Sequence, residues 1–259
     1  MSEELLYEIH DDIGRITFNR PQARNSFTFA MYERLREICT QIGKDSSVKA
    51  LVLTGAGGKA FAAGTDISQF REFSSGEDVM GYEARIERTV SALETCPVPT
   101  IAAIGGACTG GGFTIAGCCD LRIGTADARF GVPISRTLGN CLSIANYTRL
   151  VSLLGPARVK DIIFTARLIE AEEAGRIGLL NEILPDYESL QRRADELART
   201  VASHAPLTLR ATKEALRRIK ERMIPGEDRD LILMCYQSGD FREGMDAFLN
   251  KRQPKWTGK

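Results

Sequence analysis

The chain has 259 residues, which is the length of one large domain or of one domain with a small appendage. Hydrophobic residues make up 43% of it and charged residues 26%, proportions that are typical of a soluble globular protein. Lys plus Arg and Asp plus Glu each number 34, so the net charge is zero. This balance argues against a nucleic-acid-binding protein, which usually carries a basic surplus.

Targeting and metal-binding patterns are not found in the sequence. Its apolar runs fall short of the roughly 18 residues that a membrane-spanning helix needs. The acidic segment 1–14 resembles neither a secretory signal nor an Arg-rich transit peptide. Seven cysteines at irregular spacing and two histidines match no metal-ligand pattern. We therefore expect a cytoplasmic protein with free thiols, no metal and no membrane association.

The first half of the chain alternates between strand and helix patterns. Alternating apolar residues around a turn at Asp11 predict a β-hairpin. Short apolar runs predict buried strands, and apolar residues three or four positions apart predict helices. In order, we predict strands 5–9 and 13–18, helix 27–43, strand 49–55, helix 78–95, strand 100–106, a short helix after 105–112, and short strands 121–125 and 128–133.

The second half is almost wholly helical, with a short strand predicted at 181–184. Strand–helix alternation followed by a helical tail predicts an α/β fold. We divide it into a core over 1–195 and a C-terminal helical subdomain over 196–259. The predicted helices are 142–154, 156–165, 171–176, 187–204, 206–223 and 227–251.

Two turns of small residues, 61–66 and 105–112, each follow a predicted buried strand and precede a helix. Such turns leave backbone N–H groups unpaired at the start of the helix. Two N–H groups aimed at one point form an oxyanion hole, which stabilises negative charge on a carbonyl oxygen. Taken alone, each turn is weak evidence, because a GGG before a helix is more often explained by tight packing than by a binding site. The spacing in 105–112 does not match a dinucleotide-binding fingerprint.

Four ordered motifs resemble the signature of the crotonase (enoyl-CoA hydratase/isomerase) superfamily. They are NRPQARNSF (19–27), KAFAAGTDI (59–67), AAIGGACTGGGFTIAGCCDLRIG (102–124) and ARFGVP (128–133), and the tail 240–259 resembles the family's C-terminal end. The resemblance spans nearly the full chain. It implies a crotonase-like ββα spiral core with a C-terminal helical subdomain that builds the interface of a homotrimer or a dimer of trimers.

The resemblance also implies the ligand, an acyl-CoA thioester, with coenzyme A entering only as part of the substrate. The backbone N–H groups of Thr65 and Gly111 would form the oxyanion hole. Arg24 occupies the position of an Arg near the CoA phosphates in dihydroxynaphthoyl-CoA synthases, although it also fits a solvated loop. Asp66 fits a helix N-terminal cap better than a catalytic carboxylate. The residues that the resemblance places at CoA are Ala23, Arg24, Ala62, Ala63, Gly64, Asp66 and Ile67.

The chain departs from the family at the residues that transfer protons. Hydratases of this family use two glutamates at the Cα–Cβ bond, and the aligned positions here are Thr114 and Ile134. Each missing acid or base costs about 10²–10⁴-fold in rate. We therefore expect hydration of a simple enoyl-CoA, such as crotonyl-CoA, to be slow or absent.

Several other side chains could replace the missing glutamates. Thr114 and Ser135 can position a water or a substrate oxygen, although an unactivated hydroxyl is a poor base. Arg136 and Asn140 can bind a substrate carboxylate or carbonyl, which predicts a polar acyl group. Glu83 and Glu87 on the predicted 78–95 helix fit a solvated helix face better than the site. Tyr236 fits the core better than a neighbouring subunit's pocket.

The sequence is therefore compatible with three functions. The first is an acyl-CoA-processing enzyme of the lyase class that stabilises a thioester enolate and uses a different set of proton-transfer groups. The second is an acyl-CoA-binding homologue without catalysis. The third is a subunit that is active only within a hetero-oligomer.

Overall fold

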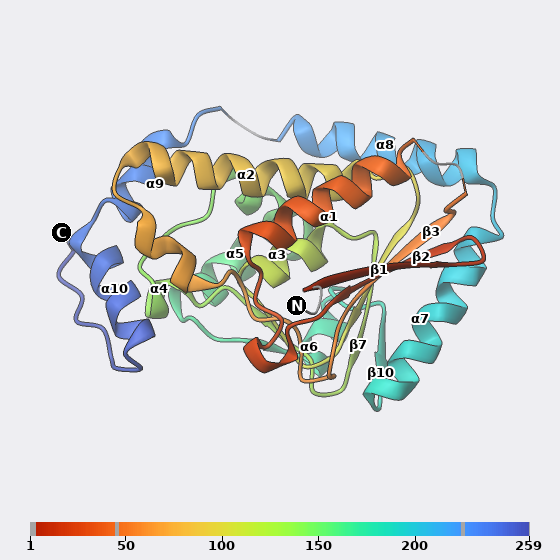
Figure 1. Ribbon diagram of the computed structural model, residues 1–259, viewed down its shortest axis with the longest axis horizontal. Helices are drawn as coiled ribbons and strands as arrows, with labels where there is room; N and C mark the ends of the chain where they lie inside the picture. Colours follow the sequence, from red (N-terminus) through yellow and green to blue (C-terminus); the bar gives the residue numbers. More distant parts are fainter. Residues whose placement is uncertain (1–3, 45–46, 224–225, 259) are drawn as a thin grey trace.

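The structure is a computed structural model that describes residues 4–44, 47–223 and 226–258. Within these residues the strands form two sheets, with helices packed around them (Figure 1). The larger sheet has the order β1-β2-β3-β5-β7-β10, and the smaller has the order β4-β6-β8-β9. The strands are β1 (Leu5–His10), β2 (Ile13–Phe18), β3 (Ala50–Gly55), β4 (Ala60–Ala62), β5 (Thr100–Ile104), β6 (Ala107–Thr109), β7 (Leu121–Thr125), β8 (Arg129–Gly131), β9 (Ile169–Glu170) and β10 (Glu182–Leu184).

A strand of the large sheet is repeatedly followed by a strand of the small sheet and then by a helix. This order occurs in β3–β4–α2, in β5–β6–α3 and in β7–β8–α4, which confirms the expected ββα core. The helices are η1 (Pro21–Ala23), α1 (Phe29–Ile42), η2 (Ile67–Glu72), α2 (Gly76–Glu94), α3 (Gly111–Cys118), α4 (Ile134–Thr137), α5 (Ile144–Phe164), α6 (Ala171–Arg176), α7 (Tyr187–Ala202), α8 (Pro206–Glu221), α9 (Arg229–Tyr236) and α10 (Gly239–Leu249); η1 and η2 are 3-10 helices.

The central strands of the large sheet are buried on both faces, as their continuous apolar runs predict. Alternate residues point to opposite faces of a strand, so β3 contributes to two cores. Ala50 and Val52 pack with α7, whereas Leu51 and Leu53 pack in the core that α1, α2 and α3 share. The two glycine-rich turns follow β4 and β6 of the smaller sheet, and these strands follow β3 and β5 of the larger sheet along the chain.

The helical tail differs from the sequence prediction at one point. The predicted helix 227–251 is two helices, α9 and α10, which are separated at Gln237. Ser238 caps α10 by accepting a hydrogen bond from the N–H of Phe241, 3.0 Å away, and this cap starts a new helix direction. The predicted break between 142–154 and 156–165 is confirmed, because Gly155 adopts a positive φ of 75° inside α5.

The C-terminal helices fold back over the same chain. Helix α8 packs against α5, α9 packs along α2, and α10 contacts α4 and η2 (Figure 1). Helix α7 runs unbroken through residue 195, and the division of the chain there stays a prediction. Within the described residues, none of the helices is long and apolar enough to cross a membrane.

Candidate active site

A cavity of about 530 Å³ lies between the two glycine-rich turns, α2, α4 and α9. Its walls include backbone from both turns and side chains from segments that are far apart in the sequence. Of the predicted site residues, those that line it are Ala23, Arg24, Ala63, Gly64, Thr65, Asp66, Ile67, Gly111, Thr114 and Asn140. Most of the predicted set therefore shares one concave site.

The two turns are in direct contact. Gly64 has a positive φ of 103°, a conformation that favours glycine, and a Cβ added there would lie 3.9 Å from the Gly111 nitrogen. A Cβ added to Gly111 would lie 3.6 Å from the Thr65 nitrogen and would overlap the Tyr32 hydroxyl. The backbone nitrogens of Thr65 and Gly111 therefore border the same small volume.

The backbone hydrogen bonds around Thr65 and Gly111 do not use the N–H group of either residue. The bridge between Phe27 and Thr65 uses the Gly64 carbonyl and the Asp66 N–H, which leaves out the N–H of Thr65. Gly111 is the first residue of α3, and an N–H in the first turn of a helix has no acceptor within that helix. Both groups can therefore serve an acceptor in the cavity.

Two tyrosines, the buried Tyr32 and the partly buried Tyr82, fix the side chain of Thr65. Its hydroxyl lies 2.9 Å from the Tyr32 hydroxyl and 3.2 Å from the Tyr82 hydroxyl. Burial raises the pKa of both phenols, so they stay neutral. This cluster was not predicted from the sequence, because it joins α1 and α2 to a turn between them. It holds the Thr65 backbone in place.

The outer part of the cavity is formed by the predicted CoA-contacting residues. The Ala63 N–H donates to the Arg24 carbonyl at 3.0 Å, which ties the first turn to η1. Asp66 caps η2 by accepting from the Ser68 N–H at 3.2 Å, and it also pairs with Arg20 at 2.9 Å. Burial alone would raise the pKa of Asp66, but the bonds from Ser68 and Arg20 lower it below its usual range.

Asp66 is therefore an engaged cap, in agreement with the interpretation that the sequence favoured. Ala62 does not line the cavity. It lies buried in β4, and its carbonyl packs against Gly112. Ala62 therefore contributes to the packing between the two turns and does not contact the cavity.

The two positions that the resemblance assigns to the usual glutamates face the cavity. Thr114 of α3 and Ile134 of α4 both line it, and both are more than nine-tenths buried. The Thr114 hydroxyl is 3.5 Å from the Gly110 carbonyl, within its own helix. Ile134 offers only hydrocarbon. Neither residue brings an ionisable group to these positions.

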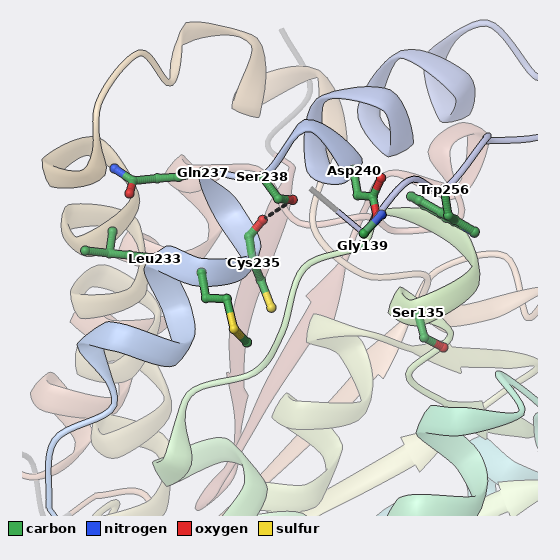
Figure 2. A pocket seen from close by; sticks show the side chains of 10 residues that line it. Ser135, Gly139, Leu233, Cys235, Gln237, Ser238, Asp240 and Trp256 are labelled. Atoms are coloured by element: carbon green, nitrogen blue, oxygen red, sulfur yellow. Dashed lines mark hydrogen bonds between the residues drawn. The ribbon is translucent and has the colours of Figure 1, made fainter.

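Ser135 and Arg136 do not line this cavity. Ile134 begins the short helix α4, which turns Ser135 and Arg136 outward and leaves Thr137 and Leu138 facing the cavity. The Ser135 hydroxyl donates to the Ile163 carbonyl, and the side chain lies in a second hollow of about 590 Å³ beside α9 and α10 (Figure 2). Arg136 is exposed. Within one chain the structure therefore separates these two residues from the rest of the predicted set.

A buried carboxyl occupies the inner part of the cavity. Glu83 of α2 is 9% exposed, and its Oε1 accepts a hydrogen bond from the Tyr236 hydroxyl at 2.8 Å. The Tyr236 hydroxyl in turn accepts from the Asn140 side-chain nitrogen at 3.0 Å. Burial raises the pKa of Glu83 to about 7, although the bond from Tyr236 opposes the shift. Glu83 can therefore exchange its proton near neutral pH.

The solvated-face interpretation was wrong for Glu83, and the helical pattern contained the signal. Val79, Glu83, Ile86, Val90 and Leu93 are all buried, and they recur every three or four residues along one face of α2. A carboxyl on an apolar helix face is rare, and one that lines a cavity is a candidate functional group. Glu87, one turn further on, instead forms a salt bridge with Arg149 through both carboxylate oxygens, at 2.7 Å each.

The raised pKa of Glu83 predicts a pH effect on stability. The folded protein keeps this proton up to about pH 7, whereas the unfolded chain loses it near 4.5. The retained proton therefore contributes to the free energy of unfolding fully below pH 4.5, and this contribution is lost as the pH rises to about 7. It amounts to about 3 kcal/mol, because the two pKa values differ by about 2.5 units. Glu83→Gln should therefore gain stability relative to the wild type between pH 5 and pH 8 in urea unfolding. Parallel pH responses of the two proteins would contradict the assignment.

Comparison with known proteins agrees with this architecture. The Enoyl-CoA hydratase/isomerase family model matches residues 8–259. The chain is 34% identical over 254 residues to the short-chain-enoyl-CoA hydratase of Clostridium acetobutylicum, covering 96% of this chain and 95% of the relative. It is 32% identical over 263 residues to the crotonyl-CoA hydratase of Syntrophomonas wolfei, covering 99% of each.

Solved structures give the same result. The chain superposes with a TM-score of 0.80 on an enoyl-CoA hydratase/carnithine racemase from Magnetospirillum magneticum, with 30% identity, covering 100% of this chain and 97% of that one. It superposes with a TM-score of 0.90 on a methylmalonyl-CoA decarboxylase in complex with 2-nitronate-propionyl-CoA, with 26% identity and 99% of each chain covered. The chain belongs to the enoyl-CoA hydratase/isomerase family of the crotonase superfamily.

Proposed function

We propose that this enzyme binds an acyl-CoA thioester and stabilises its enolate with the backbone N–H groups of Thr65 and Gly111. The observation that carries the proposal is the contact of the two turns at the cavity, with both nitrogens bordering one volume. Negative charge that develops on the thioester oxygen is stabilised by donors already held in place. The cluster of Tyr32, Tyr82 and Thr65 supplies that rigidity.

The CoA moiety lies along the first turn in this proposal. Backbone at Ala63 and Gly64 meets the pantetheine and adenine, and Arg24 donates to the phosphates at the mouth of the cavity. Coenzyme A is part of the substrate, and the proposal needs no other cofactor. We propose the same trimer or dimer of trimers, and the same cytoplasmic location, that the sequence led us to expect.

The acyl group that we propose is polar, and the chemistry does not use the usual pair of glutamates. Thr114 and Ile134 stand in their places, which supports slow turnover of simple enoyl thioesters. Ser135 and Arg136 lie outside the cavity of one chain, so Asn140 is the proposed contact for the polar acyl group. The alternative that these substitutions favour is an acyl-CoA-binding homologue without catalysis, or a subunit that needs a second chain.

A chromophoric thioester tests the oxyanion hole. Cinnamoyl-CoA should bind with a red shift of its absorption band, because hydrogen bonds to the carbonyl oxygen draw electron density along the conjugated chain. The matched S-alkyl thioether of CoA lacks that oxygen and should bind more weakly, by about tenfold or more for two lost hydrogen bonds. Equal affinities together with an unshifted band would refute the proposal, whatever the enzyme does catalytically.

A further inference from the structure

Glu83 differs from the other charged groups of the cavity. The charged side chains that line it, within the described residues, are Arg24, Asp66 and Glu83. Arg24 and Asp66 lie on the side where we place CoA, and Asp66 is held by Ser68 and Arg20. Glu83 instead projects from α2 beside Tyr236 and Asn140. It is therefore the carboxyl available to the acyl end of a bound thioester.

Asn140 carries a second, independent sign of a ligand. Its side-chain nitrogen donates to Tyr236, but its Oδ1 is buried and lacks a hydrogen-bond partner among the described residues. Buried acceptors are almost always satisfied, and this one belongs to a residue that lines the cavity, so a ligand can supply the missing donor once the Asn140 side chain turns toward it. The hydrogen bonds from Asn140 to Tyr236 and from Tyr236 to Glu83 connect this residue to the buried carboxyl.

We propose that Glu83 is the acid–base group of a single-carboxyl dehydration of 3-hydroxyacyl thioesters, and that Asn140 Oδ1 accepts the hydrogen bond of the 3-hydroxyl. This inference rests on the proposed function, because the step passes through an enolate held by Thr65 and Gly111. It specifies the polar acyl group as a neutral hydroxylated one.

A single carboxyl, Glu83, is sufficient for this dehydration, because the proton that it removes is the proton that it later donates. The Glu83 carboxylate removes the proton from Cα, and the C–H electron pair becomes the enolate charge on the thioester oxygen. The carbonyl then re-forms, the Cα=Cβ double bond closes and the Cβ–O bond breaks. The departing hydroxyl takes the proton from Glu83 and leaves as water. The reverse sequence adds water to the enoyl thioester, with Asn140 accepting the hydrogen that is not transferred. Because one carboxyl replaces the usual two, we expect both directions to be slow, in agreement with the slow turnover proposed for simple enoyl thioesters.

The surroundings of Glu83 favour an uncharged acyl group. The ionisable groups that interact with it are all acids, and Arg149 is bound to Glu87 and Glu94 at 2.7 and 2.9 Å. An acyl carboxylate would meet repulsion here without a compensating cation. These neighbours are Tyr32 of α1, Tyr82 and Glu87 of α2, Cys141 before α5, and Asp228 and Tyr236 at α9.

The first test follows proton transfer at Cα. Full-length wild-type enzyme is incubated with 3-hydroxybutyryl-CoA in D₂O, and deuterium at Cα and the formation of crotonyl-CoA are measured by NMR. Glu83→Gln should slow both by about 10²–10⁴-fold, because the amide cannot carry the proton. Glu77→Gln is the matched control on the same helix, because Glu77 is exposed and outside the cavity, and it should keep the wild-type rate.

The outcomes separate this inference from the proposed function. A wild-type cinnamoyl-CoA band shift that survives in Glu83→Gln, together with lost exchange, supports both. If the band shift is normal but Glu83→Gln exchanges at the wild-type rate, the role of Glu83 is overturned and the oxyanion hole is not. The same holds if the band shift is normal and the wild type shows no exchange. An absent band shift overturns the oxyanion hole and the inference with it.

The pH profile tests Tyr236 as a positioning residue. The active form is the carboxylate, so kcat/KM should rise with pH and level off above about pH 7, the pKa of Glu83 in the folded protein. The hydrogen bond from Tyr236 lowers that pKa, so Tyr236→Phe should move the midpoint to higher pH. A purely structural role would reduce the rate without moving the midpoint, and that result would contradict the inference.

Binding measurements test Asn140. Asn140→Leu keeps the approximate shape of the side chain and removes its acceptor. Its affinity for 3-hydroxybutyryl-CoA should fall by about fivefold to tenfold relative to its affinity for butyryl-CoA, the value of one hydrogen bond. Equal losses for the two thioesters in calorimetry would show that Asn140 does not contact the hydroxyl.

Discussion

Replacing Gly111 by proline should lower kcat for exchange at Cα of 3-hydroxybutyryl-CoA by about 10²–10³-fold relative to the Gly111→Ala variant. Proline has no N–H, so the substitution deletes one proposed donor to the thioester oxygen. Gly111 is the first residue of α3, a helix position that accepts proline well because its N–H makes no helical bond. The fold of α3 should therefore survive.

The alanine variant is the necessary control. Any side chain at residue 111 brings a Cβ that overlaps the Tyr32 hydroxyl, so both variants carry this steric cost. They differ in the N–H group and in the ring Cδ of proline that takes its place, and both differences fall on the proposed oxyanion hole. The cinnamoyl-CoA band should shift less in Gly111→Pro than in Gly111→Ala, and matching spectra and rates would remove Gly111 from the oxyanion hole.

Gly112→Ala should destabilise the protein by about 3 kcal/mol and abolish binding of CoA thioesters. A Cβ at Gly112 would overlap the Ala62 carbonyl oxygen and lie 2.8 Å from both the Ala62 carbonyl carbon and its Cβ. These atoms belong to β4 and are fully buried. The two turns would have to separate, which moves the nitrogens of Thr65 and Gly111 apart.

Gly117→Ala is a matched change in the same helix. Its Cβ would meet only the end of the Leu153 side chain, at 3.2 Å, and alanine favours helix by up to about 1 kcal/mol over glycine. Urea unfolding should therefore place Gly117→Ala near the wild type and Gly112→Ala well below it. Comparable stabilities of the two variants would show that the contact between the turns tolerates expansion.

Local patterns in the sequence were sufficient to predict the core. The sequence predicted strands β1, β2, β3, β5 and β7. Alternating apolar residues indicate a strand with one buried face, and continuous apolar runs indicate a strand buried on both faces. Strands β4, β6 and β9 were missed, since segments of two or three residues are too short to show a period. Helix α4 was missed for the same reason, and it is what turns Ser135 and Arg136 away from the cavity.

The residues around the acyl end of the site could be predicted only in part. Glu83 lies on the same face of α2 as the buried apolar residues, so the helical periodicity indicated its burial. The sequence prediction instead followed the general rule that glutamates on helices are mostly solvated. Tyr236 reaches Glu83 because α9 packs along α2. A contact between residues so far apart depends on tertiary packing, which no local pattern records.

The bond between Tyr236 and Glu83 joins residues that are 153 positions apart, and Tyr236 lies near the end of the chain. A polypeptide emerging from the ribosome completes β1 to β8, with both glycine-rich turns, long before α9 exists. The nascent chain can therefore form a thioester-binding surface while its proposed acid still lacks the phenol that holds it. Catalytic competence would then require the synthesis of 153 further residues after Glu83 and the packing of α9 against α2.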